Sequence, residues 1–306
     1  MSDLAVALVW HTHPFEELLA LVRRAEALGY RAAYVDGDVS MLPSRGEGDV
    51  LDGWTATAAL LASTARIEIG SIRLVHHWNA ARLAQAVATA VRIAPGRLRF
   101  LVSIGASPTD ARFGLPFPPA GARLAWLAEL VPALRALWAG ETVTTKGRFV
   151  ALEAARVRPV AGKIPIEVAG RGARLIELVA ALADRWDLNL PPVAKRVDDA
   201  TRQLERACRA RGRDPASIGR SMWLWTRVGE ALPQDELRAA YRRWNPWFAD
   251  LLEAELREAI VAGPAGSCRR RIDEIRRSFG VDLPVLDLAG LDRAAAERVM
   301  ESLAGA

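Results

Sequence analysis

The sequence is poor in cysteine, with only Cys208 and Cys268 among 306 residues. The two are far apart and lack metal-ligand spacing, so we expect free thiols and no structural metal. Apolar runs are interrupted by charge well before a membrane-spanning length, and the N-terminus lacks the basic flank and cleavage site of a signal peptide. These absences predict a cytoplasmic protein with no membrane contact.

The chain also lacks the short motifs of several large enzyme classes. It has no P-loop, no GxGxxG dinucleotide fingerprint, no GxSxG hydrolase elbow and no HExxH zinc motif. The net charge of +5 comes from basic residues spread along many helical segments rather than gathered in one arm. We therefore expect no nucleic-acid partner, and hydrolase and metalloenzyme functions are disfavoured.

What the chain does contain is a repeated alternation of apolar strands and amphipathic helices. Residues 66–72 and 98–103 are typical of buried parallel strands, and residues 81–93 between them repeat at helical spacing. This alternation continues along the whole chain. The predicted strands are residues 4–9, 32–35, 66–72, 98–103, 164–168, 184–188, 221–228 and 283–288.

Eight such repeats favour closure into a (β/α)8 TIM barrel with insertions, and an open doubly wound sheet is the alternative. We expect one domain over residues 1–306, with excursions from the repeat near residues 141–160 and 230–260. In both architectures, ligands bind beyond the carboxyl ends of the strands. The loops that follow the strands are therefore where functional residues are expected.

All four histidines lie in two of these loops. His11 and His13 follow the first predicted strand, and His76 and His77 follow the third. Histidine is the side chain whose ordinary pKa lies near neutrality, so imidazoles at the barrel mouth can act as general acids or hydrogen-bond donors. His11 is the best catalytic candidate because it closely follows its strand. Helix capping or solvent exposure is the alternative for His76 and His77.

Small or acidic residues end other strands. Asp36 ends the second strand, where a carboxylate in an apolar run needs a partner or solvent. It is a candidate to bind a cofactor or substrate, or else to cap the following turn. Gly70 and Ser71 permit close backbone approach beneath a planar ring. The loop of residues 170–172 lies between a strand and a helix, where backbone N–H groups can bind phosphate.

Taken together, these segments resemble the luciferase-like monooxygenase superfamily, (β/α)8 proteins that bind FMN or the deazaflavin coenzyme F420. The resemblance spans nearly the whole chain and depends on the order and spacing of its elements. They include residues 25–30 (AEALGY), 66–70 (RIEIG), 83–86 (LAQA), 163–166 (KIPI), 183–186 (ADRW) and 261–264 (VAGP). The helical segment AQAVAT, residues 84–89, is most similar to the F420-dependent branch.

The resemblance implies that Asp36 lies near the deazaflavin ring and that the Gly70-Ser71 peptide is a non-prolyl cis bond behind it. It also implies that residues 170–172 hold the phosphate, and that Lys195 and Arg196 are candidates for binding the acidic tail of F420. The cofactor-binding candidates are Asp36, Gly70, Ser71, Ser103, Gly105, Ala106, Gly170, Arg171 and Gly172. The catalytic candidates are His11, His13 and Asp36, and no metal ligand is expected.

The chain departs from the sugar-phosphate dehydrogenases of that branch at two positions. Gly37 stands where they have a histidine, and Ala106 replaces their acidic residue. The leading hypothesis is an F420-dependent oxidoreductase that transfers hydride between reduced deazaflavin and a C=C or C=N bond of a small specialised metabolite. The alternatives are an FMN-dependent luciferase-like monooxygenase and a cofactor-free ligand-binding barrel. Expected partners are the substrate, a second copy in a homodimer, and a reductase that supplies reduced F420 or flavin.

Overall fold

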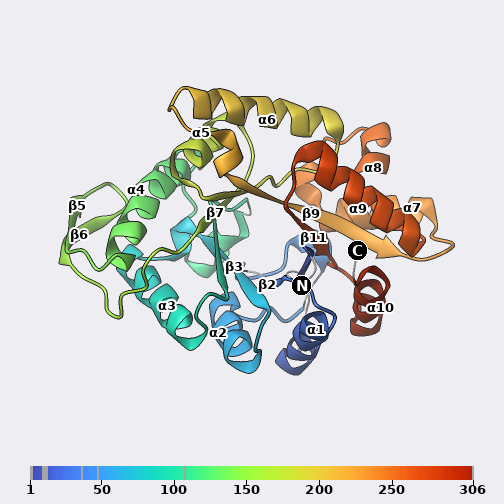
Figure 1. Cartoon of the computed structure of the whole chain (residues 1–306), viewed down its shortest axis with the longest axis horizontal. Helices are drawn as coiled ribbons and strands as arrows, with labels where there is room; N and C mark the ends of the chain where they lie inside the picture. Colours follow the sequence, from blue (N-terminus) through green and yellow to red (C-terminus); the bar gives the residue numbers. More distant parts are fainter. Residues whose placement is uncertain (1–2, 9–12, 36, 47, 107, 305–306) are drawn as a thin grey trace.

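A computed structural model describes residues 3–8, 13–35, 37–46, 48–106 and 108–304. Its central feature is a closed barrel of eight parallel strands ringed by helices, so the predicted TIM barrel is confirmed (Figure 1). Closure comes from the pairing of β8 with β9, β9 with β11, and β11 with β1. The strands are β1 (Ala5–Ala7), β2 (Ala32–Val35), β3 (Glu68–Leu74), β4 (Leu98–Ser103), β7 (Ile166–Ala169), β8 (Arg185–Asp187), β9 (Gly219–Val228) and β11 (Leu283–Asp287).

The main helices cover the outer face of the barrel. They are α1 (Phe15–Ala27), α2 (Gly53–Ser63), α3 (Ala80–Ile93), α4 (Ala120–Trp138), α5 (Ala173–Leu182), α6 (Ala194–Arg209), α9 (Ala265–Phe279) and α10 (Arg293–Leu303). Local sequence fixes several ends: Asp52 caps α2 and Asn79 caps α3 by accepting backbone N–H groups, and Gly280 ends α9 in the left-handed conformation. Within the described residues, none of the helices combines the length and apolar character needed to cross a membrane.

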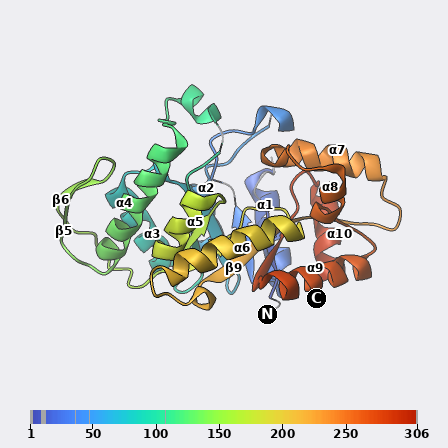
Figure 2. The ribbon, with the colours of Figure 1, turned by 90° about the horizontal axis from the view of Figure 1, so that it is seen from above.

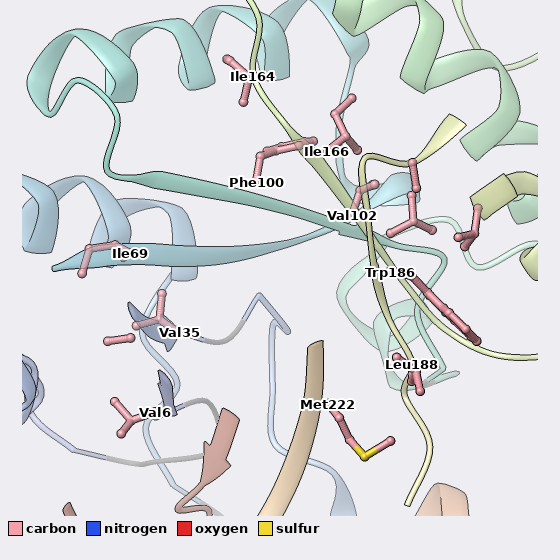
Figure 3. Close-up of a cluster of buried hydrophobic side chains, with 14 of the residues drawn as sticks. Val6, Val35, Ile69, Phe100, Val102, Ile164, Ile166, Trp186, Leu188 and Met222 are labelled. Carbon is pink, nitrogen blue, oxygen red and sulfur yellow. The ribbon is translucent and has the colours of Figure 1, made fainter. Parts of the chain in front are cut away.

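The alternation of side chains along each strand separates two cores. Phe100 and Val102 of β4 and Ile166 of β7 point outward into the large cluster beneath the helices (Figure 3). The intervening residues point into the barrel, where Tyr34 and Leu101 belong to a second, smaller cluster. Strands with apolar residues on both faces are what a parallel sheet covered by helices requires.

Two segments leave the strand–helix repeat. The first is an antiparallel hairpin of β5 (Val143–Lys146) and β6 (Ala151–Ala155), at the edge of the molecule beside α4 (Figure 1). The second comprises α7 (Gln234–Trp244), η5 (Pro246–Phe248) and α8 (Glu253–Ala259), and it leads into a short strand, β10 (Val261–Gly263). This strand, which the sequence pattern did not predict, pairs with the end of β9. Short 3-10 turns complete the fold: η1 (Pro43–Arg45), η2 (Val75–His77), η3 (Pro108–Phe113) and η4 (Pro215–Ser217).

The position of β3 corrects one prediction. The strand runs to Leu74, two residues beyond the predicted end, so Gly70 and Ser71 lie in its middle. Both keep the parallel register with β2 and β4. Among the described residues the cis peptide is Arg158-Pro159, so the bond between Gly70 and Ser71 is trans and the expected cis bond there is wrong.

Candidate functional site

A cavity of about 530 Å³ opens at the carboxyl ends of the barrel strands, where the fold class places its active sites. The last residues of five strands line it: Leu74, Ser103, Ala169, Asp187 and Asp287. Aromatic side chains of β9, α7 and η5 form an apolar wall: Trp223, Trp225, Tyr241, Trp247 and Phe248. The cavity thus combines a large apolar surface with a few polar groups at strand ends.

The cavity brings together part of the predicted site. The predicted cofactor-binding residues in its lining are Ser103, Gly105, Ala106, Gly170 and Arg171. His11 and Asp36 lie outside the described residues, so their proposed roles remain predictions. Two other candidates, His13 and Gly172, are not among the residues that line the cavity. Nδ1 of His13 lies 2.8 Å from a carboxylate oxygen of Glu17 on α1, and Gly172 is the residue before α5.

Gly70 and Ser71 serve packing within the barrel wall. A Cβ on Gly70 would lie 2.1 Å from a ring carbon of Tyr34, so the missing side chain makes room for that ring. Ser71 is fully buried, and its hydroxyl oxygen lies 2.9 Å, within hydrogen-bond distance, from that of Thr57 on α2. Neither residue belongs to the cavity lining.

The loop between β7 and α5 gives the cavity a cationic end. Arg171 donates to the backbone carbonyls of Asn189, at 3.2 Å, and Trp247, at 2.7 Å, and its guanidinium stacks on Phe248. Among the residues that the structure describes, its hydrogen-bond acceptors are neutral oxygens. The charge of Arg171 is therefore free of a bonded carboxylate beside the N-terminus of α5, an arrangement that fits the phosphate of a flavin-type cofactor.

Lys195 and Arg196, the candidates for binding the acidic tail of F420, both form ion pairs with acidic residues of this chain. Arg196 is bonded to Asp250 at 2.7 Å and to Glu255 at 2.9 Å, so two carboxylates already balance its charge. Lys195 pairs with Asp199, and its side chain is 83% exposed. Arg196 thus ties α6 to the segment containing η5 and α8, while Lys195 remains accessible at the surface.

Two buried carboxyl groups in the lining were not predicted. Asp187 ends β8 and Asp287 ends β11, and each accepts the backbone N–H of the second residue after it at 2.9 Å. Burial, followed by repulsion from Glu167, raises the pKa of Asp187 to about 7. Burial also raises the pKa of Asp287, against the opposing effect of Arg227. The sequence signal was the same as for Asp36: an acidic residue ending an apolar strand.

Beneath Asp187, a charged network crosses the barrel interior. Glu167 of β7 receives hydrogen bonds from Tyr34 at 3.1 Å, Arg99 at 3.2 Å and Ser221 at 2.5 Å. Arg99 is also bonded to Glu68 at 2.7 Å. These contacts join four neighbouring strands and the distant β9, and they satisfy a buried carboxylate that would otherwise be costly.

His76 and His77 bond the same buried acid on η3. Their Nε2 atoms lie 2.7 Å and 3.0 Å from one carboxylate oxygen of Asp110. The three side chains form a group of metal-ligand type, but both distances are those of hydrogen bonds. Burial lowers the pKa of His76, which favours its neutral form. The cluster joins the loops after β3 and β4 at the cavity rim, where Gly105 packs against His76.

The loop after β2 and the α7 segment meet above the cavity. The hydroxyl of Ser44 donates to the carbonyl of Arg243 at 3.2 Å, and Arg243 donates back to the carbonyl of Ser44. Arg45 donates to the carbonyl of Trp244, and its guanidinium lies 4.9 Å from the ring centroid of Trp247. The view in Figure 2 has α7 on the same side of the barrel as the blue segment that contains η1. These contacts connect the loop after β2 with the α7 segment.

A closed parallel barrel with a cationic, aromatic-walled cavity at its strand ends defines a (β/α)8 protein suited to an anionic cofactor. The family model of luciferase-like monooxygenases matches residues 3–283, so the chain belongs to that family.

Named relatives refine the comparison. An F420-dependent glucose-6-phosphate dehydrogenase from Beutenbergia cavernae is 33% identical over 175 residues, which cover 55% of this chain. The match spans 51% of that relative, about half its length. An F420-dependent hydroxymycolic acid dehydrogenase from Mycobacterium tuberculosis is 26% identical over 220 residues, covering 70% of this chain and 60% of the relative.

Solved structures share the fold over nearly the whole chain. An F420-dependent secondary alcohol dehydrogenase, in complex with an F420-acetone adduct, superposes with a TM-score of 0.82 at 20% identity, covering 98% of both chains. The EDTA monooxygenase of Chelativorans sp. superposes with a TM-score of 0.80 at 15% identity, covering 98% of this chain and 92% of that one. At these identities the likeness shows the fold alone.

Proposed function

We propose that this chain is an F420-dependent oxidoreductase that transfers hydride between reduced deazaflavin and a C=C or C=N bond of a small metabolite. The observation that carries the proposal is the cavity at the strand ends, with Arg171 at its cationic end. The F420-dependent dehydrogenases among the relatives support the choice of cofactor. When bound, the deazaflavin supplies the hydride, and the protein contributes binding, orientation and proton transfer.

The described residues divide these tasks. Arg171 and the N-terminus of α5 hold the phosphate, while Ser103, Gly105 and Ala106 lie where the ring would be held. The aromatic wall of β9, α7 and η5 excludes water and receives an apolar substrate. Reduced cofactor comes from a separate reductase.

Two positions support a substrate other than a sugar phosphate. A Cβ on Gly37 would lie 2.1 Å from the carbonyl oxygen of Ile72, so this backbone position has no room for the histidine of sugar-phosphate dehydrogenases. Ala106 in the cavity lining offers no acid. The acid–base groups that the resemblance associates with sugar-phosphate oxidation are thus missing from both positions.

Fluorescence titration of the purified protein with oxidised F420 and with FMN tests the cofactor. We expect saturable binding of F420 that is tighter than binding of FMN. Arg171→Ala should weaken F420 binding about 10-fold or more, because a charge-assisted hydrogen bond to phosphate is lost. Arg82→Ala, on the outer face of α3, is the control and should leave the affinity unchanged.

The second candidate is an FMN-dependent monooxygenase, favoured by the description of the family. Clearly tighter binding of FMN than of F420 would select it. Saturable binding of an apolar metabolite with no binding of either cofactor would instead support a cofactor-free ligand-binding barrel.

The substrate class is tested in two assays. Reduced F420 is mixed with a cyclic enone, a cyclic imine or a ketone, and oxidised F420 is mixed with glucose 6-phosphate. The return of oxidised-cofactor absorbance reports reduction of the acceptor. We expect turnover with the enone or the imine. Turnover confined to glucose 6-phosphate would contradict the proposed substrate class.

A further inference from the structure

Asp187 makes a contact that requires a particular protonation state. Its Oδ1 accepts the backbone N–H of Asn189, and its Oδ2 lies 3.3 Å from the hydroxyl oxygen of Ser221. The same hydroxyl lies only 2.5 Å from Oε1 of Glu167. A serine hydroxyl has one hydrogen to donate, and the shorter contact claims it for Glu167. Asp187 therefore completes the chain of hydrogen bonds only if it carries a proton and donates to Ser221.

The charges around this pair favour that arrangement. Glu167 is the member whose negative charge the surroundings balance, because Arg99 and Tyr34 both donate to it and Arg185 lies 3.9 Å away. An ionised Asp187 would place a second buried carboxylate beside Glu167. Arg185, on the same strand as Asp187, is bonded to Asp282 and offsets little of that repulsion. These surroundings favour the neutral form of the Asp187 carboxyl group, which faces the cavity.

We propose that Asp187 is the proton donor of the hydride-transfer reaction, acting on substrate from the cavity wall. This inference rests on the proposed function. A bound reduced deazaflavin would supply the hydride to one atom of the C=C or C=N bond. The proton of Asp187 leaves its hydrogen bond with Ser221, the O–H bond breaks and the proton joins the other atom, so the bond is reduced and Asp187 becomes a carboxylate. Water at the cavity mouth returns the proton, and the opposite direction of reaction uses the carboxylate as the base.

Asp287 provides the matched comparison. It has the same turn contact, to the backbone N–H of Ala289, and it also lines the cavity. Its charged neighbours differ, because Arg227 and Arg45 favour its ionised form whereas Glu167 opposes ionisation of Asp187. Of these two carboxyl groups, Asp187 is the one that, in the described part of the chain, contacts a serine hydroxyl that is also bonded to a buried carboxylate, Glu167.

Infrared spectroscopy of the isolated protein tests the protonation state without cofactor. We expect a protonated-carboxyl band at pH 6 that fades as pH rises through about 7, is absent from Asp187→Asn and is retained in Asp287→Asn. Ser221→Ala should shift the band, because its hydrogen bond is lost. Asparagine keeps the oxygen that accepts from Asn189, so the variant preserves the turn. Carboxyl bands that are identical in Asp187→Asn and wild type between pH 5 and 9 would overturn the proposal.

Kinetics test the role in the reaction. Asp187→Asn should lower kcat about 10²- to 10⁴-fold, the range for loss of a general acid, while the Kd for F420 stays within about twofold. Ser221→Ala should move the pH profile of kcat with a smaller loss of rate. An unchanged kcat and pH profile in Asp187→Asn would remove Asp187 from the chemistry. Failure of F420 to bind would overturn the proposed function and the donor role together, while the infrared result still decides the protonation state.

Discussion

Glycine at position 70 allows a tyrosine to enter the barrel interior. A Cβ at this position would lie 2.1 Å from a ring carbon of Tyr34, far inside contact distance. With that space open, the hydroxyl of Tyr34 accepts from Arg99 at 2.7 Å and donates to Glu167 at 3.1 Å. The absence of one side chain on β3 thus positions a polar group of β2 inside the charged network.

Gly70→Ala should therefore reduce the free energy of unfolding by about 1–3 kcal/mol, the cost typical of overpacking. Urea denaturation measures the change. The matched control is Gly266→Ala in α9, where a Cβ meets only a side-chain nitrogen of Arg270 at 3.6 Å. Because alanine is the better helix former, the control should be stabilising by up to about 1 kcal/mol. Equal stability of Gly70→Ala and wild type would contradict the packing argument.

Protonation of Asp187 makes the stability of the protein depend on pH. Its folded-state pKa of about 7 lies above the value near 3.9 of an unfolded aspartate, so between these values the folded state holds more protons. The contribution of this group is full below about pH 4 and is lost as pH rises to about 7. Asp187→Asn should flatten that dependence and gain a few kcal/mol relative to wild type at pH 8. Urea denaturation at pH 5 and 8 is the measurement, and an equal pH dependence in both proteins is the contrary result.

Residue patterns predicted only part of the site. Strand-end loops and small residues directed attention to Ser103, Gly105 and Gly170, which line the cavity, while their role in binding a cofactor stays a prediction. The rule applied to Asp36, an acidic residue ending an apolar strand, applied equally to Asp187 and Asp287. What the pattern could not supply was the set of neighbours around Asp187, since Ser221 and Glu167 lie on other strands.

At the level of elements, β3 extends beyond its predicted end and includes a buried cation, Arg73. The predicted strand ended before Arg73, yet Arg73 is 2% exposed and its guanidinium lies 5.4 Å and 5.8 Å from the ring centroids of Trp54 and Trp78. Aromatic faces make such a position tolerable for a guanidinium. Because both tryptophans are brought there by the fold, local sequence could not reveal that the strand continues. The short β10 escaped prediction for a similar reason, since its pairing with the end of β9 is long-range.

The segment η3 is held over the cavity rim by the contacts of Asp110 with His76 and His77. Asp110→Ala should destabilise the protein by about 1–3 kcal/mol, because two imidazoles lose a buried acceptor. Hydrogen exchange across residues 108–118 should increase more than elsewhere. Asp235→Ala is the control, since that side chain is 95% exposed.

Acidification should loosen the same segment in the wild type. Burial lowers the pKa of His76, so the stabilising contribution of neutral His76 is full above about pH 6.5 and is lost as pH falls. Exchange across η3 that is unchanged in Asp110→Ala, and unchanged between pH 7 and 5 in the wild type, would show that the cluster does not hold this segment.

For the whole molecule, strand counting predicted the barrel because closure has a regular sequence signature. Eight apolar strands separated by helices leave few other ways to cover both faces of a parallel sheet. The closing contacts were not predictable in the same way. Glu167 joins β7 to β2, β4 and β9 through Tyr34, Arg99 and Ser221, and nothing in the local sequence of a strand marks a buried carboxylate as a centre of contacts.

Removing Glu167 should therefore weaken the barrel as a unit. In Glu167→Ala, Arg99 keeps its bond to Glu68 and Arg185 keeps Asp282, so part of the buried positive charge remains balanced. The loss should be about 3 kcal/mol, the lower end of the range for breaking a buried ion pair. Thermal unfolding should stay cooperative at a lower Tm, because these contacts link strands on different sides of the barrel. Glu205→Ala on the outer face of α6, whose weak pair with Arg209 spans 3.8 Å, should change stability by less than about 0.5 kcal/mol. If both variants unfold at the same temperature, the interior network contributes no more to closure than a surface ion pair does.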